Sequence, residues 1–167
     1  SDRGDPDTCG TPAPACAAVE TSATRTFTIT VVPVNDDPVA VADDGTRVPI
    51  SLVCRRGTPR DGSARCVLYG YGAYESSMDP WFSIPRLSLV DRGVVFAVAH
   101  VRGGGELGRR WYEQGKLLAK KNSFTDFVAC ARHVIGTDWT SANRPVAPGG
   151  SAGGLLMGAV VNLAPDA

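Results

Sequence analysis

The pattern of hydrophobic positions divides the chain into three parts. Residues 1–24 contain almost no large apolar side chain, so they cannot bury enough surface to offset the entropy of ordering, and we predict a disordered tail. Over residues 26–32, apolar residues alternate with threonines, a pattern typical of a half-buried strand. From residue 45 onward, short apolar runs alternate with segments of helical periodicity. This pattern predicts a folded part that contains both strands and helices.

This last part predicts both strands and helices. Strands are expected over residues 48–53, 66–71 and 94–101, and the third is apolar throughout, as a parallel strand buried on both faces requires. Helices are expected over residues 109–121, 124–135 and 152–163. Ser123 is the expected N-cap of the middle helix, and Asp126 completes a variant of the capping box. The alternation of strands and helices predicts an α/β fold with a mostly parallel sheet and flanking helices.

Charge excludes some classes of function. The chain has 17 Lys plus Arg against 17 Asp plus Glu, so we expect no nucleic-acid partner. No apolar run approaches the roughly 20 residues that span a bilayer, so we predict no signal peptide and no membrane segment. Residues 1–44 hold two basic and eight acidic residues (2 − 8 = −6), and residues 45–167 hold 15 and nine (15 − 9 = +6). This change of sign is a boundary signal near residue 45.

Cysteine and histidine spacing does not indicate a metal site. The five cysteines form no C-x-x-C pair, and the chain contains only two histidines. These are too few well-spaced ligands for zinc. We expect mostly unpaired thiols, no metal and no other cofactor.

One short motif indicates nucleophilic catalysis. The run Gly149-Gly150-Ser151-Ala152-Gly153-Gly154 contains G-x-S-x-G where a short predicted strand meets a helix, the position of a nucleophile elbow. There the serine occupies a strained turn, the flanking glycines allow strand and helix to pass closely, and the Ala152 N–H points toward a developing oxyanion. The alternative is a glycine-rich turn without catalytic function.

A second glycine pattern carries less weight. Gly103, Gly105 and Gly108 spell G-x-G-x-x-G after the apolar strand, as a dinucleotide site would. Such a site needs an acid at the end of the next strand, and Asp126 lies in a predicted helix instead, where capping accounts for it. His100 is followed by Val101-Arg102, so a lipase-like HGGG loop is also absent.

Four longer stretches carry a resemblance to a known family. DGTRVPISLV, LYGYGAY, the stretch over residues 77–135 and GGSAGGLLMGAVVNLAPD resemble the start of the catalytic domain of prolyl oligopeptidase serine peptidases, most closely the oligopeptidase B branch. The resemblance implies a partial α/β-hydrolase fold over residues 45–167. Residues 25–44 resemble instead the closing strand and linker of a bacterial cadherin-like surface repeat. The first implies a cytoplasmic protein, and the second an extracellular one.

The family resemblance also implies residue roles. It makes Ser151 the acylated nucleophile, with the Ala152 N–H and the Tyr71 hydroxyl as oxyanion donors. It implies a serine-type endopeptidase that hydrolyses peptides after Arg or Lys, and Asp79 is a candidate for holding the substrate cation, the alternative being a solvated loop acid. Arg102 and Glu106 are expected to form a structural pair.

Several features depart from the family pattern. In this fold the acid and the histidine follow the nucleophile, and only 16 residues follow Ser151. We therefore expect the missing C-terminal half of the domain as a partner, and little activity from this chain alone. His100 and His133 precede Ser151 and are expected to be structural. Alternative functions are a non-catalytic surface or interaction segment and an α/β-hydrolase esterase.

Three substitutions near the motifs add to these departures. Glu75 stands where the family usually has glycine. Pro145 and Pro148 lie in or beside the short strand before the elbow. Proline lacks an N–H for a sheet ladder and belongs on sheet edges, whereas this strand is expected to be central, so we expect the elbow to be distorted.

Overall fold

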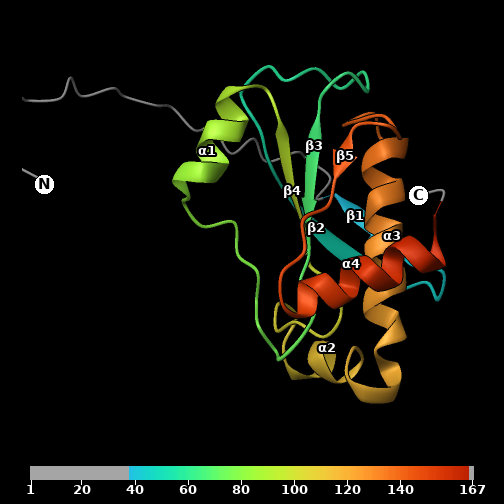
Figure 1. Ribbon diagram of the computed structural model, residues 1–167. Coiled ribbons are helices and arrows are strands. Elements are labelled where there is room, and N and C mark those ends of the chain that lie inside the picture. Colours follow the sequence, from blue (N-terminus) through green and yellow to red (C-terminus); the bar gives the residue numbers. More distant parts are fainter. Residues whose placement is uncertain (1–37, 166–167) are drawn as a thin grey trace, which may run out of the picture.

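A five-stranded mixed sheet forms the centre of the computed structural model, which describes residues 38–165 (Figure 1). Its strand order is β1-β2-β4-β3-β5. The strands are β1 (Val39–Val41), β2 (Arg47–Val53), β3 (Cys66–Tyr69), β4 (Val95–Ala99) and β5 (Pro145–Val146). The pairs β1–β2 and β2–β4 are antiparallel, and β4–β3 and β3–β5 are parallel. The predicted α/β class is confirmed, with a sheet that is parallel only from β4 onward.

Helices cover both faces of this sheet. They are α1 (Ile84–Asp91), α2 (Arg109–Glu113), α3 (Lys121–Gly136) and α4 (Ala152–Leu163), with a 3₁₀ turn at Leu117–Ala119. Figure 1 shows α1 on one side of the sheet and α3 and α4 on the other. Within residues 38–165, no helix is long and apolar enough to cross a bilayer.

Strand β4 supplies side chains to both cores, and all five of its residues are buried. Val95, Ala97 and Ala99 pack in the core beneath α3 and α4. Phe96 and Val98 pack on the opposite face, with Val90 of α1. The prediction of a strand buried on both faces is confirmed.

Several predicted element boundaries are wrong. The strand expected over 94–101 spans only Val95–Ala99. The helix expected over 109–121 ends at Glu113, because the chain passes so closely at Gly115 that a Cβ there would lie 2.2 Å from the Arg102 carbonyl carbon. Helix α3 begins at Lys121, so Ser123 lies inside it and is not its N-cap. The strand expected over 66–71 ends at Tyr69. Helix α1, which contains a proline in its first turn, was not predicted.

Strand β5 contains only two residues. Pro145 pairs with Cys66 and Val146 with Val67, and Pro148 lies beyond the strand. Within the described residues β5 is the end strand of the sheet, where proline is tolerated, and not a central strand as expected. The expected distortion of the elbow is not seen, because Ser151 occupies the strained turn that the motif predicts.

A buried ion pair joins the loop that follows β4 to α3. Two guanidinium nitrogens of Arg102 donate to the two carboxylate oxygens of Asp126, over 2.8 and 2.6 Å, and the Arg102 backbone N–H donates over 2.9 Å. Arg102 is 3% exposed and Asp126 0%. The expected capping role of Asp126 and the expected Arg102–Glu106 pair are therefore both wrong.

The second ion-pair partner of Arg102 is Asp44, which accepts a hydrogen bond of 2.6 Å from the guanidinium. This hydrogen bond lowers the pKa of Asp44 from 3.8 to about 2. Because Asp44 is 47% exposed, solvent screens much of the interaction.

The predictions for residues 1–37 lie outside the described residues, as do Cys9 and Cys16. Cys54, Cys66 and Cys130 are free thiols. Strand β1 comes from the segment compared with a surface repeat, yet it pairs with β2. The domain boundary near residue 45 stays a prediction. Strands β1 and β2, which belong to one sheet, lie on either side of it.

We expect Asp126→Asn to lower the free energy of unfolding by about 3 kcal/mol or more, because it leaves the buried Arg102 charge largely uncompensated. Asp44→Asn, which removes the exposed partner of the same arginine, should cost only about 1 kcal/mol. Urea unfolding of both variants measures the difference. Equal losses would contradict the dominance of the buried pair.

Asp44 also gives a dependence of stability on pH. Its folded pKa of about 2 lies below the ordinary 3.8, so its contribution is complete above pH 3.8 and is lost as the pH falls toward 2. Between pH 5 and pH 2, the wild type should lose about 1 kcal/mol more than Asp44→Asn. Parallel pH-dependent unfolding curves for the two proteins would refute this.

Candidate active site

Ser151 lies in a strained turn between β5 and α4. Its backbone has φ 53° and ψ −124°, a region that costs a residue with a side chain of order 1–3 kcal/mol. The side chain is exposed, and among the described residues its hydroxyl forms no hydrogen bond. This geometry is the one that a nucleophile elbow requires.

Two of the four elbow glycines are required by close packing. A Cβ on Gly149 would lie 2.5 Å from the carbonyl oxygen of Gly153, and one on Gly153 would lie 3.2 Å from that of Gly70. Gly150 has nothing within 4 Å of such a Cβ, and Gly154 has only ordinary contacts. The two outer glycines of G-x-S-x-G thus stand where two backbone segments pass too closely for a side chain.

The Ala152 N–H and the ring of Tyr71 both lie near the start of α4. Within the described residues, the Ala152 N–H has no backbone acceptor, whereas the next two amides donate to Gly150 and Ser151. Tyr71 is half-buried, and its ring lies beside Gly153, 3.7 Å from where a Cβ would stand. The structure therefore places Tyr71 and Ala152, two residues predicted for the oxyanion site, against the same turn of helix.

Packing beneath the elbow explains this proximity. Gly70 follows β3, and a Cβ there would lie 2.8 Å from the ring of Phe127 on α3 and 3.3 Å from Leu156 on α4. Phe127 is 2% exposed and Leu156 is fully buried. The end of β3 therefore fits between two helices only because residue 70 has no side chain.

Asp79 lies on the loop between β3 and α1. The carboxylate is exposed and forms no ion pair among residues 38–165. The neighbouring Met78 N–H donates to Glu106 Oε1 over 2.9 Å, which fixes this loop to the loop after β4. No described side chain joins Asp79 to Ser151.

His100 belongs to a separate polar cluster that the sequence did not reveal. Its Nε2 lies 2.7 Å from Ser51 Oγ, and its Nδ1 lies 3.6 Å from Glu106 Oε1. The one available signal was the alternation in β2, which sets Ser51 on the face opposite Ile50. His133 lies on α3, where burial lowers its pKa. Neither histidine is hydrogen-bonded to Ser151, and the described residues contain no cluster suited to a metal ion.

Most of this chain matches known proteins in sequence. A family model described as "Prolyl oligopeptidase family" matches residues 80–167. This chain belongs to the prolyl oligopeptidase family. It is 53% identical to dipeptidyl aminopeptidase BI of Pseudoxanthomonas mexicana over 128 residues and 50% identical to protease 2 of Moraxella lacunata over 125. These matches cover 76% and 75% of this chain but 18% of each relative.

Solved structures agree with the family assignment. Oligopeptidase B from Leishmania major matches with a TM-score of 0.73 and 50% identity, over 77% of this chain and 18% of that one. Oligopeptidase B from Trypanosoma brucei, with covalently bound antipain, matches with a TM-score of 0.74 and the same identity and coverage. The predicted resemblance and the predicted α/β-hydrolase fold are confirmed. The chain spans about a fifth of these family members.

Glu75, where the resemblance predicts glycine, has a backbone conformation that favours glycine. Glu75 has φ 57° and follows Tyr74 at φ 59°, a left-handed region that favours glycine. The Glu75 carboxylate accepts a hydrogen bond of 2.6 Å from Arg109, in an exposed ion pair.

We therefore expect Glu75→Gly to raise the free energy of unfolding by about 1 kcal/mol, because relief of the left-handed backbone outweighs the loss of a solvent-screened ion pair. Glu75→Gln keeps the backbone cost and removes the charge, so it should not stabilise. Thermal unfolding of the three proteins decides the question. Stabilisation by both variants would assign the effect to charge.

Proposed function

We propose that this chain provides the nucleophile of a serine peptidase that forms an acyl-enzyme at Ser151. The observation that carries the proposal is the left-handed backbone of Ser151 on a turn closed by Gly149 and Gly153. A residue with a side chain holds such a conformation only where the surrounding structure requires it. Membership of a peptidase family supports the same chemistry.

The proposed reaction assigns a role to each residue at the elbow. Ser151 Oγ attacks the carbonyl carbon of the scissile bond, and the oxygen of that carbonyl becomes an oxyanion. The Ala152 N–H and the Tyr71 hydroxyl donate to this oxyanion, so they stabilise charge that develops only in the transition state.

A general base must remove the Ser151 proton, because a serine hydroxyl is a weak nucleophile at neutral pH. Solved structures of prolyl oligopeptidase B from Galerina marginata include variants in which a serine, an aspartate or a histidine is replaced by alanine. In that chain the aspartate and histidine come after the serine. We infer that the base and its acid come from a segment that follows the matched part, so residues 1–167 alone have little activity.

The proposed substrates are peptides with Arg or Lys before the scissile bond. Similarity to oligopeptidase B supports this class. Asp79 is exposed and has no ion pair in the part of the chain that the structure describes, so its carboxylate is available for a substrate cation. An esterase that uses the same Ser151 is the second candidate within this fold.

Exposed apolar surface on α4 supports a requirement for a complementary segment. This helix carries no charged residue, and Leu155 and Val161 are 60% and 67% exposed. Exposed apolar side chains on a helix without charges favour an interaction with another segment. The same observation favours the non-catalytic alternative, in which the chain acts only as an interaction segment.

The test combines this chain with the segment of Moraxella lacunata protease 2 that follows its matched region. Alone, the chain should release negligible chromophore from Arg-ending and Lys-ending peptides. The mixture should hydrolyse them and should label with a phosphonate probe, and Ser151→Ala should abolish both signals. Tyr71→Phe should lower kcat roughly 10²-fold, whereas Tyr74→Phe, its exposed neighbour, should not.

Each other outcome contradicts a stated part of the proposal. Turnover by the chain alone that depends on Ser151 would show that no further segment is needed. Turnover that survives Ser151→Ala would exclude this nucleophile. Faster hydrolysis of simple esters than of basic peptides would favour the esterase, and a well-formed complex without turnover would favour the interaction segment.

A further inference from the structure

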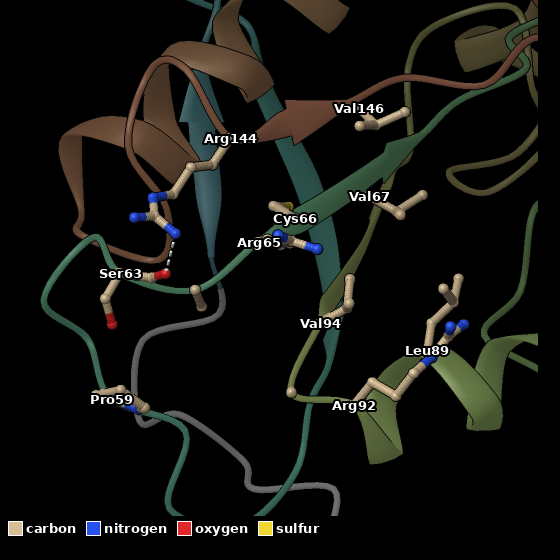
Figure 2. A pocket seen from close by; sticks show the side chains of 12 residues that line it. Pro59, Ser63, Arg65, Cys66, Val67, Leu89, Arg92, Val94, Arg144 and Val146 are labelled. Atoms are coloured by element: carbon tan, nitrogen blue, oxygen red, sulfur yellow. Dashed lines mark hydrogen bonds between the residues drawn. The ribbon is translucent and has the colours of Figure 1, made fainter.

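The two ends of strand β3 lie in different surroundings. At its amino end, Cys66 and Val67 line a pocket of about 640 Å³ beside β5 (Figure 2). At its carboxyl end, β3 leads through Gly70 to Tyr71, the residue proposed to donate to the oxyanion. The lining of the pocket includes neither Tyr71 nor Ser151. The contacts that bear on the Tyr71 hydroxyl are therefore those at the carboxyl end of the strand.

Gly72, the residue after Tyr71, places its carbonyl against the chain that follows β4. Gly72 is buried and has φ 65°, a left-handed conformation that favours glycine. A Cβ on Gly103 would overlap the Gly72 oxygen, so the two backbones pack directly against each other. A buried carbonyl needs a hydrogen-bond donor, and within the described residues no backbone N–H donates to this one.

Two side chains from the start of α3 approach this carbonyl. Lys120 Nζ donates to the Gly72 oxygen, and it also donates to Ser123 Oγ over 3.2 Å. Ser123 Oγ lies 3.5 Å from the Gly72 oxygen but 2.5 Å from the Arg102 oxygen. Because a hydroxyl has one proton to donate, Ser123 donates to Arg102. The Gly72 carbonyl therefore depends on the Lys120 ammonium.

The two lysines at the start of α3 have different surroundings. A helix N-terminus disfavours cations, yet Lys120 and Lys121 both lie there. Lys121 is exposed, so water solvates its charge. Lys120 is half-buried, and it forms no ion pair among residues 38–165. Burial lowers its pKa, so the ammonium is held at this position despite two unfavourable effects, in contact with the Gly72 carbonyl.

Tyr71 thus lies between two fixed points of the backbone. On one side Gly70 fits between α3 and α4, and on the other side Gly72 is held by Lys120. An oxyanion donor acts only within narrow limits of distance, and a small change in the backbone displaces a hydroxyl at the end of a long side chain. We propose that Lys120 is a positioning residue, whose ammonium fixes the Gly72 carbonyl and thereby directs the Tyr71 hydroxyl toward the oxyanion. This inference rests on the proposed acylation at Ser151.

A double-mutant cycle in the mixture with the protease 2 segment tests the inference. Lys120→Met keeps the apolar stem and removes the ammonium, so it should lower kcat about tenfold with little change in KM, a part of the roughly 10²-fold loss expected for Tyr71→Phe. In the Tyr71→Phe background the same change should have no further effect, because both act through one hydroxyl. Lys120→Arg should retain most of kcat. Lys121→Met is the matched control and should retain all of it.

Fluorine NMR of the full chain by itself gives a readout that needs no turnover. With 3-fluorotyrosine in place of the four tyrosines, the Tyr71→Phe variant identifies the Tyr71 signal. Lys120→Met should shift or broaden this signal, because the turn that carries the ring loses its donor. The signal of Tyr69 in β3 should stay in place as a marker of the intact fold. Lys121→Met should change neither signal.

Each contrary result refutes a separate claim. The inference is wrong if Lys120→Met leaves the Tyr71 signal unchanged, if it lowers kcat equally with and without the Tyr71 hydroxyl, or if Lys120→Arg loses as much kcat as Lys120→Met. A displaced Tyr69 signal would show that Lys120 supports the fold as a whole, which also contradicts a positioning role. Turnover that survives Ser151→Ala refutes the proposed acylation instead, and the fluorine signals then still decide whether Lys120 fixes Tyr71.

Discussion

The buried pair between Arg102 and Asp126 is the interaction on which the arrangement of this domain depends. It places a guanidinium group immediately after β4 in contact with a carboxylate one turn into α3. Ser123 adds a hydrogen bond of 2.5 Å from its hydroxyl to the Arg102 carbonyl. A buried charge left without its partner is costly, so α3 can occupy essentially one position relative to the central strand.

The position of α3 in turn fixes the position of the elbow through side-chain packing. Phe127 lies on α3 one residue after Asp126. Its ring and the Leu156 side chain of α4 both lie close to Gly70, where a Cβ would contact both. Helix α4 is thereby set against the end of β3, and Gly149 and Gly153 let its first turn meet the incoming chain. The strain at Ser151 is maintained by contacts that extend back to the ion pair, which is how a rigid scaffold holds a costly backbone conformation.

The sequence revealed those features whose causes are local. A strand was predicted over residues 94–101 because a continuous apolar run is typical of a strand buried on both faces, and β4 lies within it. A helix was predicted over about residues 152–163, and α4 has these bounds. The elbow itself is a local signal of the same kind.

Features that depend on distant partners were missed or misassigned. Asp126 fitted a capping pattern three residues long, whereas its real partner lies 24 residues away. The pairing of Ser51 with His100 spans 49 residues, and the break after α2 depends on a backbone contact at Gly115. No periodicity within one element encodes such contacts.

The turn at Ser151 and the two histidines of the described part are held by separate contacts. Ser151 holds its left-handed backbone, and Ala152 presents an unoccupied N–H, while neither described histidine bonds to the nucleophile. Glycine packing against Gly70 and the burial of Leu156 are sufficient to account for the turn within the described residues. An oxyanion site without a base retains only part of the catalytic effect, so the reactivity proposed for Ser151 depends on a base that the described residues do not supply.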